Sequence, residues 1–195
     1  MIKNLAILTL SLLVLSVNAQ QSNGEYFYPQ VGWHLHLPDG FRLQDSAITS
    51  KQIQQGKDAV EKSNNTKLDA SKSVELFTST GLGFQRFSAS ITPFDQALDG
   101  DYQTVDQNLK KEICNTFLKQ VPNSTVDTAS STLKIGGLDF IKFRLALIVN
   151  GNKMLTLYLL SRNYRGYNFA ISYLCQDDQT REAIEKALLA SHFDR

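Results

Sequence analysis

The fold is decided by residues 138–175, which read LDFIKFRLALIVNGNKMLTLYLLSRNYRGYNFAISYLC. Two tight turns divide this stretch into three extended segments. Asn150-Gly151 is typical of a two-residue hairpin turn, and Arg165-Gly166 makes a second one. The stretch therefore predicts a three-stranded antiparallel meander.

The two turns predict strand registers that can be checked against each other. The first sets Leu147 beside Met154, Leu145 beside Thr156, Phe143 beside Tyr158 and Ile141 beside Leu160. The second sets Leu160 beside Ile171, Tyr158 beside Tyr173 and Thr156 beside Cys175. These registers agree on the shared middle strand. They predict one face made of Ile141, Phe143, Leu145, Met154, Tyr158, Leu160, Phe169, Ile171 and Tyr173.

The opposite face of this predicted sheet is also apolar in its middle. It carries Ala146, Ile148, Leu155, Leu157, Leu159, Ala170 and Leu174. An antiparallel sheet with one face open to water shows polar residues on that face, so both faces must be covered. With helices before, between and after the strands, the pattern predicts the α+β class: a three-layer α/β/α sandwich with a central, mainly antiparallel sheet.

The flanking elements follow from their own patterns. Alternation predicts a strand over residues 31–37, with Val31, Trp33, Leu35 and Leu37 on one side and His34 and His36 on the other. Further strands are expected at 74–79 and 83–92, and one ending at Ile135 before a Gly136-Gly137 hairpin. A first helix is expected from about 47 to 62. A second begins at Thr104, which forms a capping box with Gln107, and its apolar face carries Val105, Leu109, Ile113, Phe117 and Val121. A last helix is capped by Asp177-Asp178, and its Ile184, Leu188 and Leu189 are expected to point inward.

The N-terminus has the pattern of a secretory signal peptide. Lys3 precedes an apolar run from Leu5 to Val17, and Val17-Asn18-Ala19 ends it with a small residue. The run is shorter than the roughly 20 residues of a spanning helix. We expect cleavage after Ala19, a single domain over residues 20–195, and a secreted or periplasmic protein without membrane insertion of the mature chain.

Charge and cysteine content narrow the function further. Lys3 is one of 20 basic residues against 19 acidic ones, so the mature chain is formally neutral and nucleic acid is not an expected partner. Only Cys114 and Cys175 are present. In an exported chain the two can form a disulfide, and the alternative is two separate buried thiols.

Two segments carry a family resemblance. Residues 28–41, YPQVGWHLHLPDGF, form an opening extended segment that ends in a proline turn, and residues 167–173 lead into a helix that ends Leu188-Leu189-Ala190-Ser191-His192-Phe193. In this order of elements the chain resembles the PsbP-like proteins. The resemblance implies an α/β/α sandwich and an accessory, scaffolding or partner-binding role, by analogy at the level of fold. No functional residue carries over.

Two groups of residues have some of the ligands of a metal-ion site. His34 and His36 share one side of a strand and can supply two ligands to zinc or copper. A metal site needs a third ligand, but His192 is far away in the sequence and no acidic residue has the spacing of a metal ligand. Residues 95–101, with Gly100, Asp101 and the later Asp106, resemble half of a calcium-binding loop. The alternative for the latter is an acidic turn before a helix. Neither is predicted to be a metal site.

The remaining features point to binding rather than catalysis. There is no Gly-x-Ser-x-Gly elbow, and Gly81-Leu82-Gly83 is a turn too short to hold a phosphate. No catalytic, cofactor-binding or metal residue is predicted, and no cofactor. The expected function is an exported accessory protein that binds an unknown partner protein or envelope component. The alternative is a small-molecule or metal-ion binding protein with an aromatic groove lined by Tyr26, Phe27, Tyr28, Trp33, Tyr158, Tyr164, Tyr167 and Tyr173.

Overall fold

The computed structural model describes residues 20–22, 24–64 and 72–194, so the predicted signal peptide lies outside the described residues. The helices are α1 (Ser46–Asn64), α2 (Gln96–Asp99), α3 (Tyr102–Gln120) and α4 (Asp178–Ala190). The strands are β1 (Gln20–Ser22), β2 (Glu25–Tyr28), β3 (Trp33–His36), β4 (Arg42–Leu43), β5 (Val74–Thr80), β6 (Arg86–Pro93), β7 (Ser124–Ile135), β8 (Leu138–Val149), β9 (Asn152–Tyr164), β10 (Tyr167–Cys175) and β11 (His192–Phe193).

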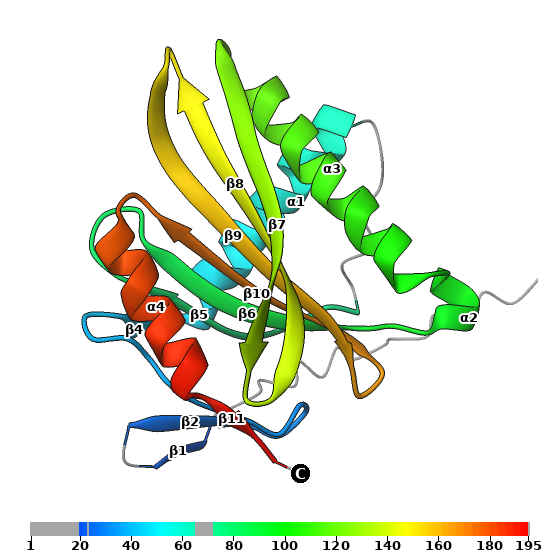
Figure 1. Ribbon diagram of the computed structural model, residues 1–195, viewed down its shortest axis with the longest axis vertical. Coiled ribbons are helices and arrows are strands. Elements are labelled where there is room, and N and C mark those ends of the chain that lie inside the picture. The colour runs from blue at the N-terminus through cyan, green and yellow to red at the C-terminus, as the bar shows by residue number, and fades with distance from the viewer. Residues whose placement is uncertain (1–19, 23, 65–71, 195) are drawn as a thin grey trace, which may run out of the picture.

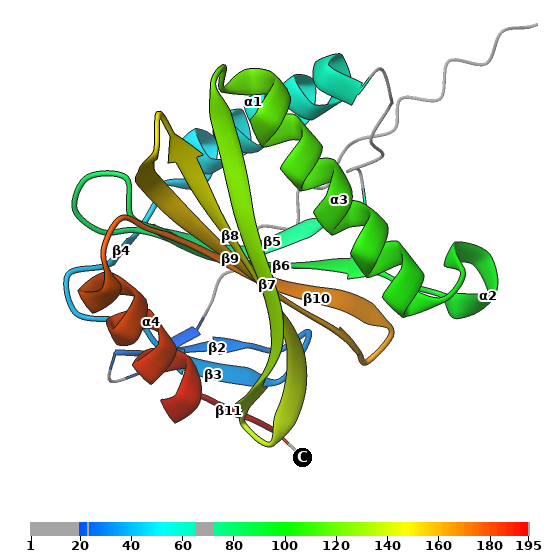
Figure 2. The same ribbon diagram turned by 45° about the horizontal axis from the view of Figure 1, so that its top comes forward.

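A central antiparallel sheet separates two outer layers. Its seven strands run in the order β4-β5-β6-β10-β9-β8-β7. Helices α3 and α1 lie against each other on one side, and Figure 2 shows α4 on the other side together with β2, β3 and β11. The predicted three-layer α/β/α sandwich with a mainly antiparallel sheet is confirmed.

The register of the first hairpin differs from the prediction. Val149 and Asn152 flank the turn as expected, but Leu147 lies opposite Leu155 because Met154 bulges out of β9. A shift of one residue sends every later side chain of the partner strand to the other face. Phe143 and Leu145 therefore lie on the α3 side of the sheet, and Tyr158 lies on the opposite side. The prediction that these three residues share one face is wrong. The β9–β10 register is confirmed.

Two details of the predicted helices are corrected. The cap of α3 is Asp101, whose carboxylate accepts the Thr104 amide at 2.9 Å, so the helix begins earlier than Thr104. Leu109 on this helix is exposed, and so is Leu189 on α4. The Asp177 cap of α4 and the burial of its Ile184 and Leu188 are confirmed.

A second sheet, of order β1-β2-β3-β11, joins the two ends of the described chain and was not predicted. Its inner face packs onto the main core through Tyr28, Trp33 and Leu35, which are completely buried. Trp33 also donates its indole Nε1–H to Ser191 Oγ at 2.9 Å, at the end of α4. The small sheet is thus part of the α4 layer (Figure 1).

The α1 side of β5 and β6 carries polar side chains. Arg86 donates to Gln52 of α1 at 2.8 Å and to Thr78 at 3.3 Å, and Thr78 donates to the Glu75 carboxylate at 2.6 Å. Burial raises the pKa of Glu75 from the ordinary 4.5 to about 7, against the lowering effects of Thr78 and Arg86. Folding therefore favours the protonated form of Glu75.

This raised pKa predicts a pH-dependent stability. Between about pH 4.5 and 7 the folded state keeps a proton that the unfolded state has released, so the free energy of unfolding falls as pH rises through this window. In the wild type the free energy of unfolding should fall by about 2–3 kcal/mol across this window, and Glu75→Gln should abolish that fall. Urea unfolding at stepped pH measures it, with the exposed Glu112→Gln as the matched control. Parallel wild-type and Glu75→Gln curves would contradict the assignment.

Candidate functional site

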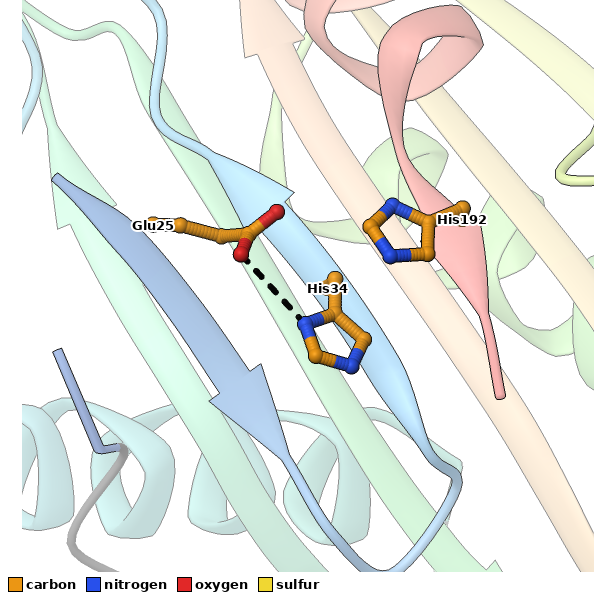
Figure 3. Close-up of side chains that lie close together, drawn as sticks. All are labelled: Glu25, His34 and His192. Atoms are coloured by element: carbon orange, nitrogen blue, oxygen red, sulfur yellow. Dashed lines mark ion pairs between the residues drawn. The ribbon is translucent and has the colours of Figure 1, made fainter. Parts of the chain in front are cut away.

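The outer face of the small sheet gathers the histidines of the chain. Alternation in β3 turns Trp33 and Leu35 inward, so His34 and His36 point outward. Pairing with β11 sets His192 directly opposite His34, and pairing with β2 sets Glu25 opposite His36. Figure 3 shows Glu25, His34 and His192 facing one another from three different strands. We call these three residues the outer-face cluster.

The geometry of the outer-face cluster centres on His34. Its Nδ1 lies 3.5 Å from Glu25 Oε2, and its Nε2 lies 3.1 Å from Asp194 Oδ1. The His34 and His192 rings stack almost in parallel, with centroids 4.5 Å apart. One donor atom from each of Glu25, His34 and His192 lies within 4.8 Å of the others. Two imidazoles and one carboxylate are a donor set that transition metal ions accept.

The structure brings together what the sequence left apart. Strand alternation correctly predicts that His34 and His36 share one side of β3. No pattern in the sequence predicts that His192, Glu25 or Asp194 lies beside them. His192 reaches His34 because β11 pairs with β3. The sequence does indicate that His192 and Phe193 are extended after the last helix. No local pattern identifies the strand with which they pair.

A second surface feature is the loop between β5 and β6. Leu82 and Phe84 are 85% and 75% exposed. The loop is nevertheless closed: the Gly81 amide donates to the Gln85 carbonyl at 3.1 Å, and the Gln85 side chain donates to Asp177 and Thr180 at the start of α4. Gly83 supports the turn with φ of +67°, a conformation that costs glycine little. Two large apolar side chains are thus held in water on an ordered loop.

The acidic segment before α3 caps helices. Asp95 accepts the Ala97 amide at the start of α2, and Asp101 accepts the Thr104 amide at the start of α3. The Thr104 hydroxyl donates to the same Asp101 carboxylate, and the two hydrogen bonds from Thr104 lower the pKa of Asp101. Asp106 points instead into the α3–sheet interface, where it pairs with Lys110. Asp95 and Asp101 therefore form the acidic turn before a helix that the second interpretation predicts.

The aromatic side chains fill the core instead of lining a groove. Tyr28, Trp33, Tyr158 and Tyr173 belong to one buried cluster, and burial raises the pKa of the Tyr28 and Tyr173 hydroxyls. Tyr26, Tyr164 and Tyr167 pack against that cluster. Phe27 lies on the outer face and stacks on His34, with ring centroids 4.5 Å apart. The aromatic groove is not formed by these residues.

The two cysteines are separate free thiols. Cys114 on α3 packs against the apolar cluster on one face of the central sheet, whereas Cys175 belongs to the core on the other face. The sheet therefore stands between them, and the alternative of two separate thiols is the one observed. Burial raises the pKa of Cys175 to about 12 and also raises that of Cys114, so neither is an activated nucleophile.

No protein-family model and no curated protein matches the sequence. Solved structures do match. The solution structure of the cyanobacterial PsbP protein, CyanoP, from Synechocystis sp. PCC 6803 has a TM-score of 0.56 at 11% identity, covering 87% of this chain and 91% of that one.

Two further structures resemble the chain more weakly. A crystal structure from Bacteroides thetaiotaomicron has a TM-score of 0.47 at 13% identity, covering 88% of this chain but 48% of that one. LpqN, involved in cell envelope biogenesis of Mycobacterium tuberculosis, has a TM-score of 0.44 at 14% identity, covering 84% of this chain and 83% of that one. At such identities the likeness to CyanoP shows the fold, which is PsbP-like, as the sequence resemblance implied. Among the described residues, no helix is both long and apolar enough to span a membrane.

Proposed function

We propose that this chain, which has a PsbP-like fold, is an exported accessory protein that binds a partner protein or envelope component and catalyses no reaction. The observation that carries the proposal is the exposed pair Leu82 and Phe84 on the ordered β5–β6 loop. Scattered apolar residues are common on protein surfaces, but Leu82 and Phe84 are two residues apart on one loop, so both can contact the same partner. The N-terminal apolar run from Leu5 to Val17, followed by the small residue Ala19, supports export.

The ordering of the loop favours binding energetically. A flexible loop loses conformational entropy when a partner immobilises it, and a preformed one loses less. Here two backbone hydrogen bonds, from the Gly81 amide to the Gln85 carbonyl and from the Gln85 amide to the Leu82 carbonyl, hold the loop together with the Gln85 side-chain contacts to α4. An aromatic and an aliphatic side chain presented in this way are suited to fill an apolar pocket on the partner.

Site-specific photocrosslinking in the producing cell tests this function. A benzoylphenylalanine at position 84 of the full chain should form a discrete adduct on irradiation, which mass spectrometry then identifies. Adding Leu82→Ser should reduce the adduct by about tenfold, because it removes the neighbouring apolar contact. Both positions are exposed, so the fold should be unaffected.

The matched control places the same crosslinker at Met154, which is 54% exposed on the β8–β9 hairpin. We expect no discrete adduct from that position. Equal crosslinking from positions 84 and 154, or an adduct from position 84 that Leu82→Ser leaves unchanged, would contradict docking through the loop.

A further inference from the structure

We propose that Glu25, His34 and His192 form a binding site for a divalent transition metal ion of zinc type, with Asp194 as a positioning residue for His34. This site is independent of the β5–β6 loop, so either proposal can fail without the other. It joins strands β2, β3 and β11, and thereby the two ends of the described chain.

The contacts of His34 carry the inference. A carboxylate oxygen faces each of its ring nitrogens, Glu25 at Nδ1 and Asp194 at Nε2. A neutral imidazole has one N–H, which can satisfy only one of these carboxylates. If Nε2 donates to Asp194 at 3.1 Å, the Nδ1 lone pair points toward the Glu25 oxygen at 3.5 Å. A cation between Nδ1 and that carboxylate oxygen would be bound by both atoms, and their separation of 3.5 Å suits two ligands of one ion.

Asp194 then has the role that carboxylates commonly have beside metal-bound histidines. A histidine that binds a metal through one nitrogen usually donates its other N–H to a carboxylate or carbonyl, which fixes the tautomer and orients the ring. The Arg165 side chain donates to the Asp194 backbone carbonyl at 2.9 Å, and the Asp194 amide donates to the Gly32 carbonyl at 2.7 Å. Asp194 is therefore held in place on its backbone, with its carboxylate toward His34.

The third donor is positioned by strand pairing. His192 lies directly opposite His34, and the stacked rings bring its nitrogens to the same side as Glu25 (Figure 3). Tetrahedral zinc needs donors roughly 3.4 Å apart, and the three donors lie within 4.8 Å of one another. An imidazole lone pair lies in the plane of its ring, so the His192 ring must turn out of the stack with His34 to bind the same ion. His192 is exposed, which leaves its side chain room to turn.

The donor chemistry selects the class of ion. Two imidazoles with one carboxylate suit zinc, copper, nickel or cobalt, whereas calcium and magnesium require oxygen ligands. Three protein ligands leave a fourth position for water. His36 is outside the cluster: its Nε2 lies 3.8 Å from the other Glu25 oxygen, and its side chain is largely exposed. It therefore serves as the matched histidine control.

Calorimetric titration of the tag-free mature chain with Zn²⁺ at neutral pH, followed by Co²⁺ absorption, tests the site. We expect one saturable site with a dissociation constant in the micromolar range or below, a rise in melting temperature with Zn²⁺, and no response to Mg²⁺. His192→Asn and Glu25→Gln should each weaken binding by about tenfold or more, since each removes a ligand. Asp194→Asn should weaken it by about tenfold through His34.

The control and a residue-level readout keep the test decisive. His36→Asn should leave the affinity within about threefold, and imidazole NMR signals of His34 and His192 should shift on Zn²⁺ addition while those of His36 move little. All the ligand variants are at partly exposed or exposed positions, and circular dichroism verifies that they fold. Absence of saturable Zn²⁺ binding, or binding that survives His192→Asn and is lost with His36→Asn, would overturn the proposal.

Discussion

Replacing Asp106 by alanine should lower the free energy of unfolding by about 3–5 kcal/mol. Asp106 and Lys110 are both buried between α3 and the sheet, where they form an ion pair, and Ser161 donates to the same carboxylate at 2.5 Å. The Lys110 ammonium also lies 5.7 Å from the Phe143 ring centroid. Without the carboxylate, a buried cation remains with no counterion, and its desolvation is no longer compensated. Urea unfolding followed by circular dichroism measures the loss.

Two further variants separate charge from packing. Asp139→Ala breaks the exposed pair with Lys134 and should cost less than about 1 kcal/mol. The double variant Asp106→Leu with Lys110→Met removes both buried charges and should recover most of the stability lost in Asp106→Ala. If Asp106→Ala lowers the free energy of unfolding no more than Asp139→Ala does, then water solvates the Lys110 ammonium and the interface does not exclude it.

Trp33→Ala should destabilise the protein by a similar amount, about 3–5 kcal/mol. The side chain is completely buried among four aromatic rings, with the Phe169 centroid 5.3 Å away and the Tyr28 centroid 5.7 Å away. Its removal leaves a cavity where the small sheet packs on the core, and Ser191 Oγ loses the hydrogen bond that it accepts from the indole N–H. We expect the amide protons of β2 and β3 to exchange faster in this variant than those of β9, measured by hydrogen exchange with mass spectrometry.

Trp33→Phe is the matched variant, because it keeps an aromatic ring and loses the indole N–H. We expect it to cost about 1–2 kcal/mol, since Ser191 still donates to the Leu188 carbonyl at 2.7 Å. Phe27→Ala, on the outer face of the same sheet, should cost less than Trp33→Ala. Equally faster exchange in β2, β3 and β9 of Trp33→Ala would contradict this expectation, because it would show that the small sheet does not open separately from the central sheet.

The candidate metal site shows where reading along the chain reaches its limit. Period-two alternation around Trp33 correctly placed His34 and His36 outward, because alternation is a property of the strand itself. Glu25 and His192 join them only through the pairing of β2 and β11 with β3. The β11–β3 pairing brings together residues more than 150 positions apart, and a two-residue strand carries too few side chains to identify its neighbour.

The β8–β9 hairpin shows the same limit over a short distance. The Asn150-Gly151 turn was predicted and is confirmed, but each of the four pairs predicted across it is shifted by one residue on β9. The bulge at Met154 was not predicted, because an extra residue in one strand is decided by which faces the helices cover. With the bulge, Phe143 and Leu145 reach the apolar side of α3, and Lys142 reaches Glu185 of α4 at 2.6 Å.

The sequence alone therefore determined the fold class, the strands of the meander, the β9–β10 register, the cap of α4 and the outward direction of His34 and His36. These features depend on side-chain periodicity and turn chemistry, which act between neighbours in the chain. Only the tertiary structure decided which face each β8 side chain occupies, that the aromatic residues fill the core, that the two cysteines lie on opposite sides of the sheet, and that Glu25 and His192 meet at His34. Those outcomes depend on burial and on pairing between distant segments, where the free energy of packing both sheet faces outweighs local preference.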